Sequence, residues 1–162
     1  FAVQVDRERG YDHGTFSPLA AIYPNADVPV LQLSLKSGYD PKDHIAVGRA
    51  LAPLRDVGVL IVGSGLSYHN LRAFGPQAKG PSTAFDQWLD QTLVKSTPAE
   101  RIARLVAWDA APGARQAHPR EDHLLPLMVA VGAAGEDAGT RVYHEDDFMG
   151  GIAVSSFMFG GA

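Results

Sequence analysis

The residues best suited to chemistry in this sequence are its six histidines, three of which stand where a loop meets a helix or strand. His13 lies in the turn Asp12-His13-Gly14, His69 follows an apolar run and a Gly-Ser-Gly loop, and His123 precedes an apolar helix. Rigid elements hold reactive groups at such junctions. Imidazole binds iron, zinc and copper, and it is also the usual general acid or base near neutral pH. The sequence therefore predicts that these three rings converge on one site.

Each of these histidines also has a purely structural interpretation. His13 could cap its own turn, and His69 could bond the backbone of its loop. His123 could pair with Glu121 or Asp122 at the start of a helix. Taken one at a time, the structural interpretation is the commoner one, so the functional hypothesis depends on finding the rings together.

The other three histidines are weaker candidates. We expect His44 to be solvated in the first turns of a helix, and His118 precedes a proline in a loop. His144 stands beside the acidic run 145–147, which is typical of a solvated turn. A histidine with carboxylates could in principle hold a metal there.

The composition excludes several classes of protein and site. The 162 residues carry 14 Lys and Arg against 18 Asp and Glu, a net charge of −4. That length favours one compact domain, and an acidic chain lacks the basic face that binding to nucleic acid requires. No apolar run is long enough to span a membrane. The absence of cysteine excludes disulfides, thiolate metal sites and cysteine nucleophiles, and we expect a cytoplasmic protein.

The elements around His69 follow a strand–helix–strand pattern. Residues 28–35 alternate between apolar and polar, which predicts a strand, and Pro41 is well placed to begin a helix that stops near Gly58. The continuous apolar run 59–62 is typical of a buried strand. Such a unit predicts a right-handed crossover. His69 would then lie beyond the carboxyl end of a strand, where α/β sheets bind their ligands.

The rest of the chain predicts further helices and strands. We expect helices over 19–23, from Ser82 or Thr83, from Thr97 in a capping box, and over 124–134, and strands over 1–5, 141–144 and 152–159. The fold class is therefore α/β, a mixed central sheet flanked by helices. Because the chain opens on an apparent strand without Met, we expect it either to be part of a larger protein or to begin on a genuine N-terminal strand after removal of a short leader.

Several blocks of residues occur in an order that is itself informative. They are Gly10–Phe16, Tyr23–Ser34, Gly48–Arg55, Gly63–Arg72, Asp122–Leu127 and Ser155–Gly160. Together they resemble the class III extradiol ring-cleavage dioxygenases, the relatives of the β subunit of protocatechuate 4,5-dioxygenase, and within them the DOPA 4,5-dioxygenase type. No single motif is decisive, but the resemblance in order and spacing covers essentially the whole chain.

The resemblance implies a non-haem metal, most often Fe(II), with Zn(II) as the alternative. By position His123 matches a metal ligand, although Glu121 or Asp122 could take that place or orient the ring. His69 matches the catalytic histidine that faces the substrate and O₂, which in some relatives is counted as a neighbour of the metal. His13 matches the catalytic histidine of the Asp-His-Gly turn. Two further ligand motifs of the family, Gly-His-Gly-Ser-Pro and Ser-Ala-His-Trp, do not occur here. The resemblance therefore implies that residues 1–162 are the C-terminal portion of a single catalytic domain.

The expected function is the metal-dependent cleavage of a catecholic ring with O₂. We expect a missing N-terminal segment or a second polypeptide to complete the site, and no nucleic-acid or membrane partner. The sequence is compatible with an oligomer and does not determine the oligomeric state. One alternative is a zinc-dependent hydrolase on the same scaffold, with a zinc-bound water as nucleophile. Another is a non-enzymatic interaction protein that keeps the fold without the metal, because a fold alone does not determine function.

Overall fold

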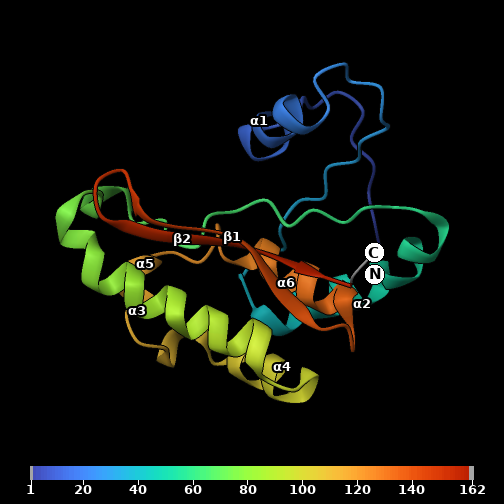
Figure 1. Cartoon of the computed structure of the whole chain (residues 1–162). Coiled ribbons are helices and arrows are strands. Elements are labelled where there is room, and N and C mark those ends of the chain that lie inside the picture. The colour runs from blue at the N-terminus through green and yellow to red at the C-terminus, as the bar shows by residue number, and fades with distance from the viewer. Residues whose placement is uncertain (1, 161–162) are drawn as a thin grey trace.

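The computed structural model describes residues 2–160, which form a group of helices with one antiparallel hairpin along its side (Figure 1). The helices are α1 (His13–Ile22), α2 (Pro41–Leu51), α3 (Lys79–Asp90), α4 (Pro98–Val106), α5 (Ala114–Ala117) and α6 (Leu125–Ala134), and the strands are β1 (Gly139–Phe148) and β2 (Ile152–Phe159). The α/β class is thus confirmed. None of the helices within residues 2–160 has the length and apolar character needed to cross a bilayer.

Local sequence signals account for most helix boundaries. The side chain of Asp40 accepts a hydrogen bond from the backbone N–H of Lys42 and Pro41 opens α2, as predicted. Thr97 and Glu100 form the predicted capping box of α4. By contrast, α3 begins at Lys79, before the expected cap. The hydroxyl of Ser82 instead accepts the backbone N–H of Ala153 in β2.

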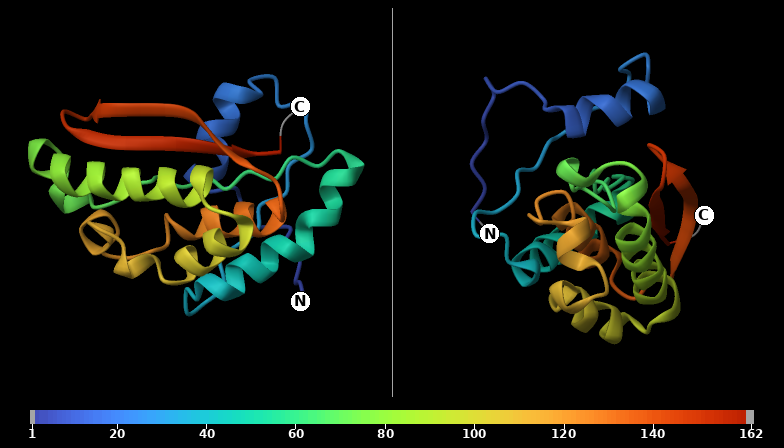
Figure 2. Two further views of the ribbon diagram at one scale, coloured as in Figure 1. Left: turned by 60° about the horizontal axis from the view of Figure 1, so that its bottom comes forward. Right: turned by 90° about the vertical axis from the view of Figure 1, so that its left-hand side faces the viewer.

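The hairpin closes the core on one side of α3 (Figure 2). Gly139 pairs with Phe159 at one end of the ladder and Phe148 pairs with Ile152 at the other, which confirms the two predicted closing strands. Ile152 and Val154 are buried, and they join the core cluster that includes Phe85 and Leu89 of α3. Phe85 and Leu89 therefore lie on the face of α3 that packs against the core.

Helices α2 and α6 approach so closely that glycine is required at their contact. A Cβ atom placed on Gly48 would lie 2.0 Å from the carbonyl oxygen of Val129, and one on Gly132 would lie 2.1 Å from that of Ile45. Helix α6 is the predicted apolar helix, with Pro126 in its first turn. Its N-terminus follows directly on His123, so this packing also holds one end of the candidate site.

Two predicted strands are not strands. Residues 28–35 and 59–62 are extended, and within residues 2–160 the only sheet is the β1–β2 pair, so no right-handed crossover forms. Leu31 is 99% exposed and Leu60 is 69% exposed. Residues 28–35 do alternate between apolar and polar, and residues 59–62 are apolar. A strand also needs a neighbouring strand to satisfy its backbone N–H and C=O groups.

The expectations for the first 23 residues were also partly wrong. Residues 2–5 are exposed and form no strand, and Phe1 lies outside the described residues. Helix α1 begins at His13 rather than near Leu19, because the side chain of Asp12 accepts the backbone N–H of Thr15 and caps the helix there.

Candidate active site

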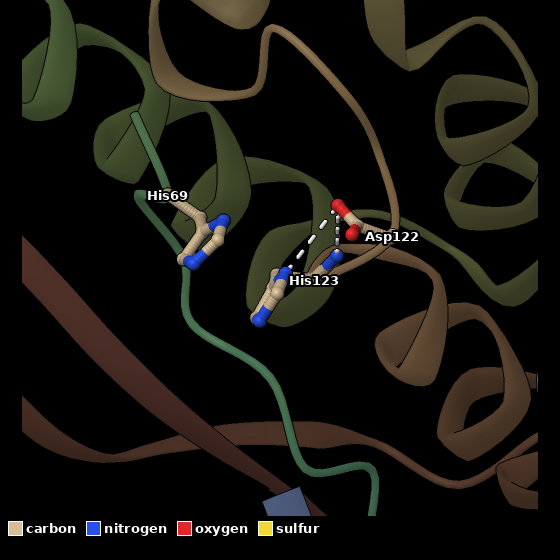
Figure 3. Close-up of side chains that lie close together, drawn as sticks. All are labelled: His69, Asp122 and His123. Carbon is tan, nitrogen blue, oxygen red and sulfur yellow. Dashed lines mark hydrogen bonds and ion pairs between the residues drawn. The ribbon is translucent and has the colours of Figure 1, made fainter. Parts of the chain in front are cut away.

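Three histidines from distant segments lie together. The ring centroids of His69 and His123 are 3.4 Å apart with the ring planes 15° from parallel, so the rings stack. The ring of His13, the first residue of α1, lies 6.4 Å from that of His123. Figure 3 shows His69 on its extended segment facing the loop that carries His123. The structure thus brings together the three rings that the sequence singled out.

Asp122 adds a carboxylate to this cluster. Its Oδ1 atom lies 3.3 Å from Nδ1 of His123 and accepts the backbone N–H of the same residue at 3.2 Å (Figure 3). His69, Asp122 and His123 each offer one ligand atom, and these atoms all lie within 4.8 Å of one another. Two imidazoles and a carboxylate form a donor set that suits Fe(II) or Zn(II).

Main-chain contacts hold the segment of His69 against the loop of His123. The backbone N–H of Leu66 donates to the carbonyl of His123 at 3.2 Å, and the N–H of His69 donates to the carbonyl of Ala117 at 2.9 Å. A Cβ atom on Gly65 would lie 2.2 Å from the carbonyl oxygen of His123. The two segments are therefore in direct backbone contact, which fixes the position of the His69 ring relative to the His123 ring.

His118 stabilises the contact between these two segments from within the core. Its side chain is fully buried, and its Nε2–H donates to the carbonyl of Ser67 at 3.1 Å. The rings of Phe85 and Trp108 contact it edge-on, at centroid distances of 5.3 and 6.1 Å. Burial lowers the pKa of His118 to about 4, so the ring is neutral at physiological pH.

Sequence reasoning placed His118 in a loop as a weak candidate and missed its burial. Its position five residues before His123, on the same loop, was the only available signal. The bond to Ser67, two residues before His69, makes His118 a support of both segments.

The charges of the site follow from its packing. Burial, and then the neighbouring rings of His123 and His13, lower the pKa of His69, although Asp122 acts in the opposite direction. Burial acts to raise the pKa of Asp122, but the contact with His123 and the nearby Arg120 outweigh it, so the net shift is downward. Near neutral pH the cluster therefore combines a neutral His69 with an ionised Asp122.

The remaining histidines lie outside this cluster. The prediction that His44 is solvated was wrong: it is 1% exposed, its Nδ1–H donates to the carbonyl of Asp40 at 2.7 Å, and its Nε2 accepts the N–H of Lys36 at 3.1 Å. The acidic run 145–147 lies in β1 rather than in a turn. His144 contacts the hydroxyl of Ser155 at 3.0 Å, within the hairpin.

Comparison with known proteins identifies the family. Residues 1–159 match the model of the "Catalytic LigB subunit of aromatic ring-opening dioxygenase". Two relatives named "4,5-DOPA dioxygenase extradiol" are those of Beta vulgaris, 40% identical over 161 residues, and of Escherichia coli K12, 34% identical over 163 residues. Each alignment covers 98% of this chain, but only 59% of the first relative and 60% of the second. The chain thus spans about 60% of the length of these relatives.

A solved structure gives the same result for the fold. The crystal structure of the uncharacterized protein JW3007 from Escherichia coli K12 superposes with a TM-score of 0.82 at 33% sequence identity, over 96% of this chain and 66% of that one. The assignment of residues 1–162 to the C-terminal portion of one catalytic domain stays a prediction. Because residues 1–159 match the family model, the chain belongs to the family of catalytic LigB subunits of aromatic ring-opening dioxygenases, the class III extradiol dioxygenases.

Proposed function

We propose that this protein, in its complete form, is a non-haem metal-dependent dioxygenase that cleaves a catecholic ring with O₂ in the extradiol manner. The observation that carries the proposal is the convergence of His13, His69 and His123 from three distant segments. Family membership supports the reaction class, and the names of the relatives support a catechol as substrate.

In this proposal His123 is a ligand of the metal. The residues fit such a role, because His123, His69 and Asp122 offer ligand atoms within 4.8 Å of one another and the pKa of the Asp122 carboxyl is lowered. We infer Fe(II), with Zn(II) as the alternative, since both accept imidazole and carboxylate ligands. When bound, the metal would supply open positions for the substrate oxygens and O₂. Asp122 would either bind it or orient the His123 ring.

His13 and His69 are the proposed catalytic residues. A general base must be unprotonated at the working pH, and the lowered pKa of His69 meets that condition. His69 would therefore accept a proton from a catechol hydroxyl. His13, whose ring centroid lies 6.4 Å from that of His123, would supply a proton as the oxygen–oxygen bond breaks.

We also propose that further polypeptide completes the site. The relatives are longer than this chain, and two of the family's ligand motifs do not occur in its sequence. The extended residues 28–35 and 59–62 expose large apolar side chains that a neighbouring chain segment would cover. Whether that segment belongs to the same polypeptide or to a second one, and whether the protein forms an oligomer in the cytoplasm, stay predictions.

The test is oxygen consumption by the complete protein. With Fe(II) and a catechol such as DOPA we expect stoichiometric O₂ uptake and a yellow semialdehyde product. Separate changes of His13, His69 and His123 to Ala should each lower kcat at least about 100-fold, the usual scale for loss of acid–base or metal function. His144→Ala, a histidine outside the cluster, is the matched control.

Three results would contradict the proposal. Full turnover in the three alanine variants would remove the site assignment. Zinc-dependent hydrolysis without O₂ uptake would favour the hydrolase. Complete protein without stoichiometric metal would favour the interaction protein.

A further inference from the structure

Gln32 makes a reciprocal pair of hydrogen bonds with the residue that precedes His13. Its Nε2–H donates to Oδ2 of Asp12 at 2.9 Å, and its Oε1 accepts the backbone N–H of Asp12 at 3.0 Å. The same Oε1 also accepts the hydroxyl of Thr15 at 2.8 Å. One amide therefore bonds the carboxylate, the backbone and the first turn of α1 at the same time.

Asp12 joins this pair to the helix. Its second oxygen, Oδ1, accepts the backbone N–H of Thr15 at 3.2 Å and caps α1. Because His13 is the first residue of that helix, its backbone direction follows from the way in which Asp12 is held. A second tie lies on the same segment, where the hydroxyl of Tyr11 donates to the carbonyl of Val30 at 2.6 Å.

These bonds matter because α1 has little else to hold it. The helix contains no buried residue, and Figures 1 and 2 show it standing apart from the other helices. The helix comes close to the segment that carries His69 at Gly14, where an added Cβ atom would lie 3.8 Å from the hydroxyl oxygen of Ser64. Packing therefore contributes little to the direction of His13, and the polar pair is left to determine it.

We propose that Gln32 is a positioning residue that directs the His13 ring toward His123 through the Asp12 carboxylate. The inference rests on the proposed function for its catalytic meaning, but the pair itself can be tested without turnover. It predicts that the orientation of the His13 ring depends on a matched hydrogen-bond donor and acceptor at positions 12 and 32, whichever of the two positions carries the donor.

The decisive experiment is a reciprocal exchange in the complete protein. Gln32→Glu sets two carboxylates face to face, and Asp12→Asn sets two NH₂ groups face to face. Asparagine is itself a good helix-capping residue, so a loosened cap in Asp12→Asn reports the loss of the pair with Gln32. The double variant Asp12→Asn/Gln32→Glu restores one amide and one carboxylate with the roles exchanged. Gln87→Glu, on the exposed face of α3, is the matched control for the added charge.

Two readouts separate positioning from catalysis. Hydrogen exchange at the Thr15 amide reports on the cap, and the ring resonances of His13 by NMR report on its surroundings. In each single variant we expect exchange about 10-fold faster, altered His13 resonances and kcat lowered about 10-fold or more with KM little changed, because small misplacement of a reacting group lowers rate strongly. The double variant should recover to within about 3-fold of the parent.

The proposal is overturned if both single variants keep the exchange rate, His13 resonances and kcat of the parent. It is equally overturned if exchange changes but kcat does not, or if the double variant is as impaired as the singles. Failure of the proposed function looks different: parent protein without catechol cleavage, or full turnover in His13→Ala, while the exchange data still report on the pair.

Discussion

The stacked pair of imidazoles limits the charge that the site can carry. With 3.4 Å between the ring centroids of His69 and His123, two positive charges would repel strongly. Burial lowers the pKa of His69 first, and the neighbouring rings add to this effect. His69 is therefore neutral near pH 7, and a neutral imidazole has one unprotonated nitrogen that can accept a proton.

His118 makes stability depend on pH. Its pKa is lowered from 6.5 to about 4 in the folded protein by burial, so between these values the unfolded chain binds a proton that the folded one does not. The free energy of unfolding should fall as pH decreases through this window, by about 2 kcal/mol at pH 5 and about 3 kcal/mol near pH 4. Above pH 6.5 both states are neutral and this contribution is constant.

Urea unfolding at pH 7 and pH 5 measures this effect against His118→Gln. Glutamine keeps an N–H donor for the carbonyl of Ser67 but does not titrate, so the difference between variant and parent should change by about 2 kcal/mol between the two pH values. A difference that does not vary with pH would show that His118 is not held neutral.

At the scale of elements, the close contact of α2 with α6 holds α6 in place. It therefore also helps to position His123, which lies just before the start of that helix. Gly132→Ala places a Cβ 2.1 Å from the carbonyl oxygen of Ile45, so one helix must move. We expect a loss of about 1–3 kcal/mol in the free energy of unfolding. We also expect weaker binding of the proposed metal, because the loop that bears His123 shifts with the helix.

Gly80→Ala is the control for this change. Gly80 also lies in a helix, but nothing stands within 4 Å of an added Cβ. Alanine there should leave stability unchanged or raise it by about 0.5–1 kcal/mol through higher helix propensity. Equal effects of the two substitutions, measured by urea unfolding, would mean that the close approach of α2 and α6 is not important.

Elements that depend on local signals were predictable, and those that depend on distant partners were not. The capping box at Thr97 and the proline at position 41 act within one turn, so sequence alone located α4 and α2. Residues 59–62 have the composition of a buried strand, but a strand is completed by a neighbour far along the chain. The sequence could not reveal whether that neighbour lies within residues 2–160.

The same division applies to the site. The positions of His13, His69 and His123 at loop junctions, with the family resemblance, were enough to select them. The stacking of two rings, the burial of His118 and the pairing of Gln32 with Asp12 are tertiary contacts between segments that show no relation in sequence. Spacing rules along one helix or strand cannot find them.

At the scale of the whole molecule, the exposed apolar side chains of the two extended segments are the most testable feature. Leu31 and Leu60 are 99% and 69% exposed, and apolar surface of this kind binds hydrophobic dyes. Residues 1–162 produced alone should enhance the fluorescence of anilinonaphthalene sulfonate, and the complete protein should do so several-fold less. Leu31→Ser/Leu60→Ser should reduce the signal of the short chain, whereas equal signals from short and complete proteins would contradict a covering segment.

The joint between the His69 segment and the His123 loop is made largely by peptide groups: Leu66 to His123, His69 to Ala117, and the bare Cα of Gly65 against a carbonyl. Peptide groups are the same whatever residue carries them. Side chains along both segments can consequently be exchanged without changing the groups that form the joint. Such a joint sets the places of the two imidazoles through the main chain, whatever side chains flank them.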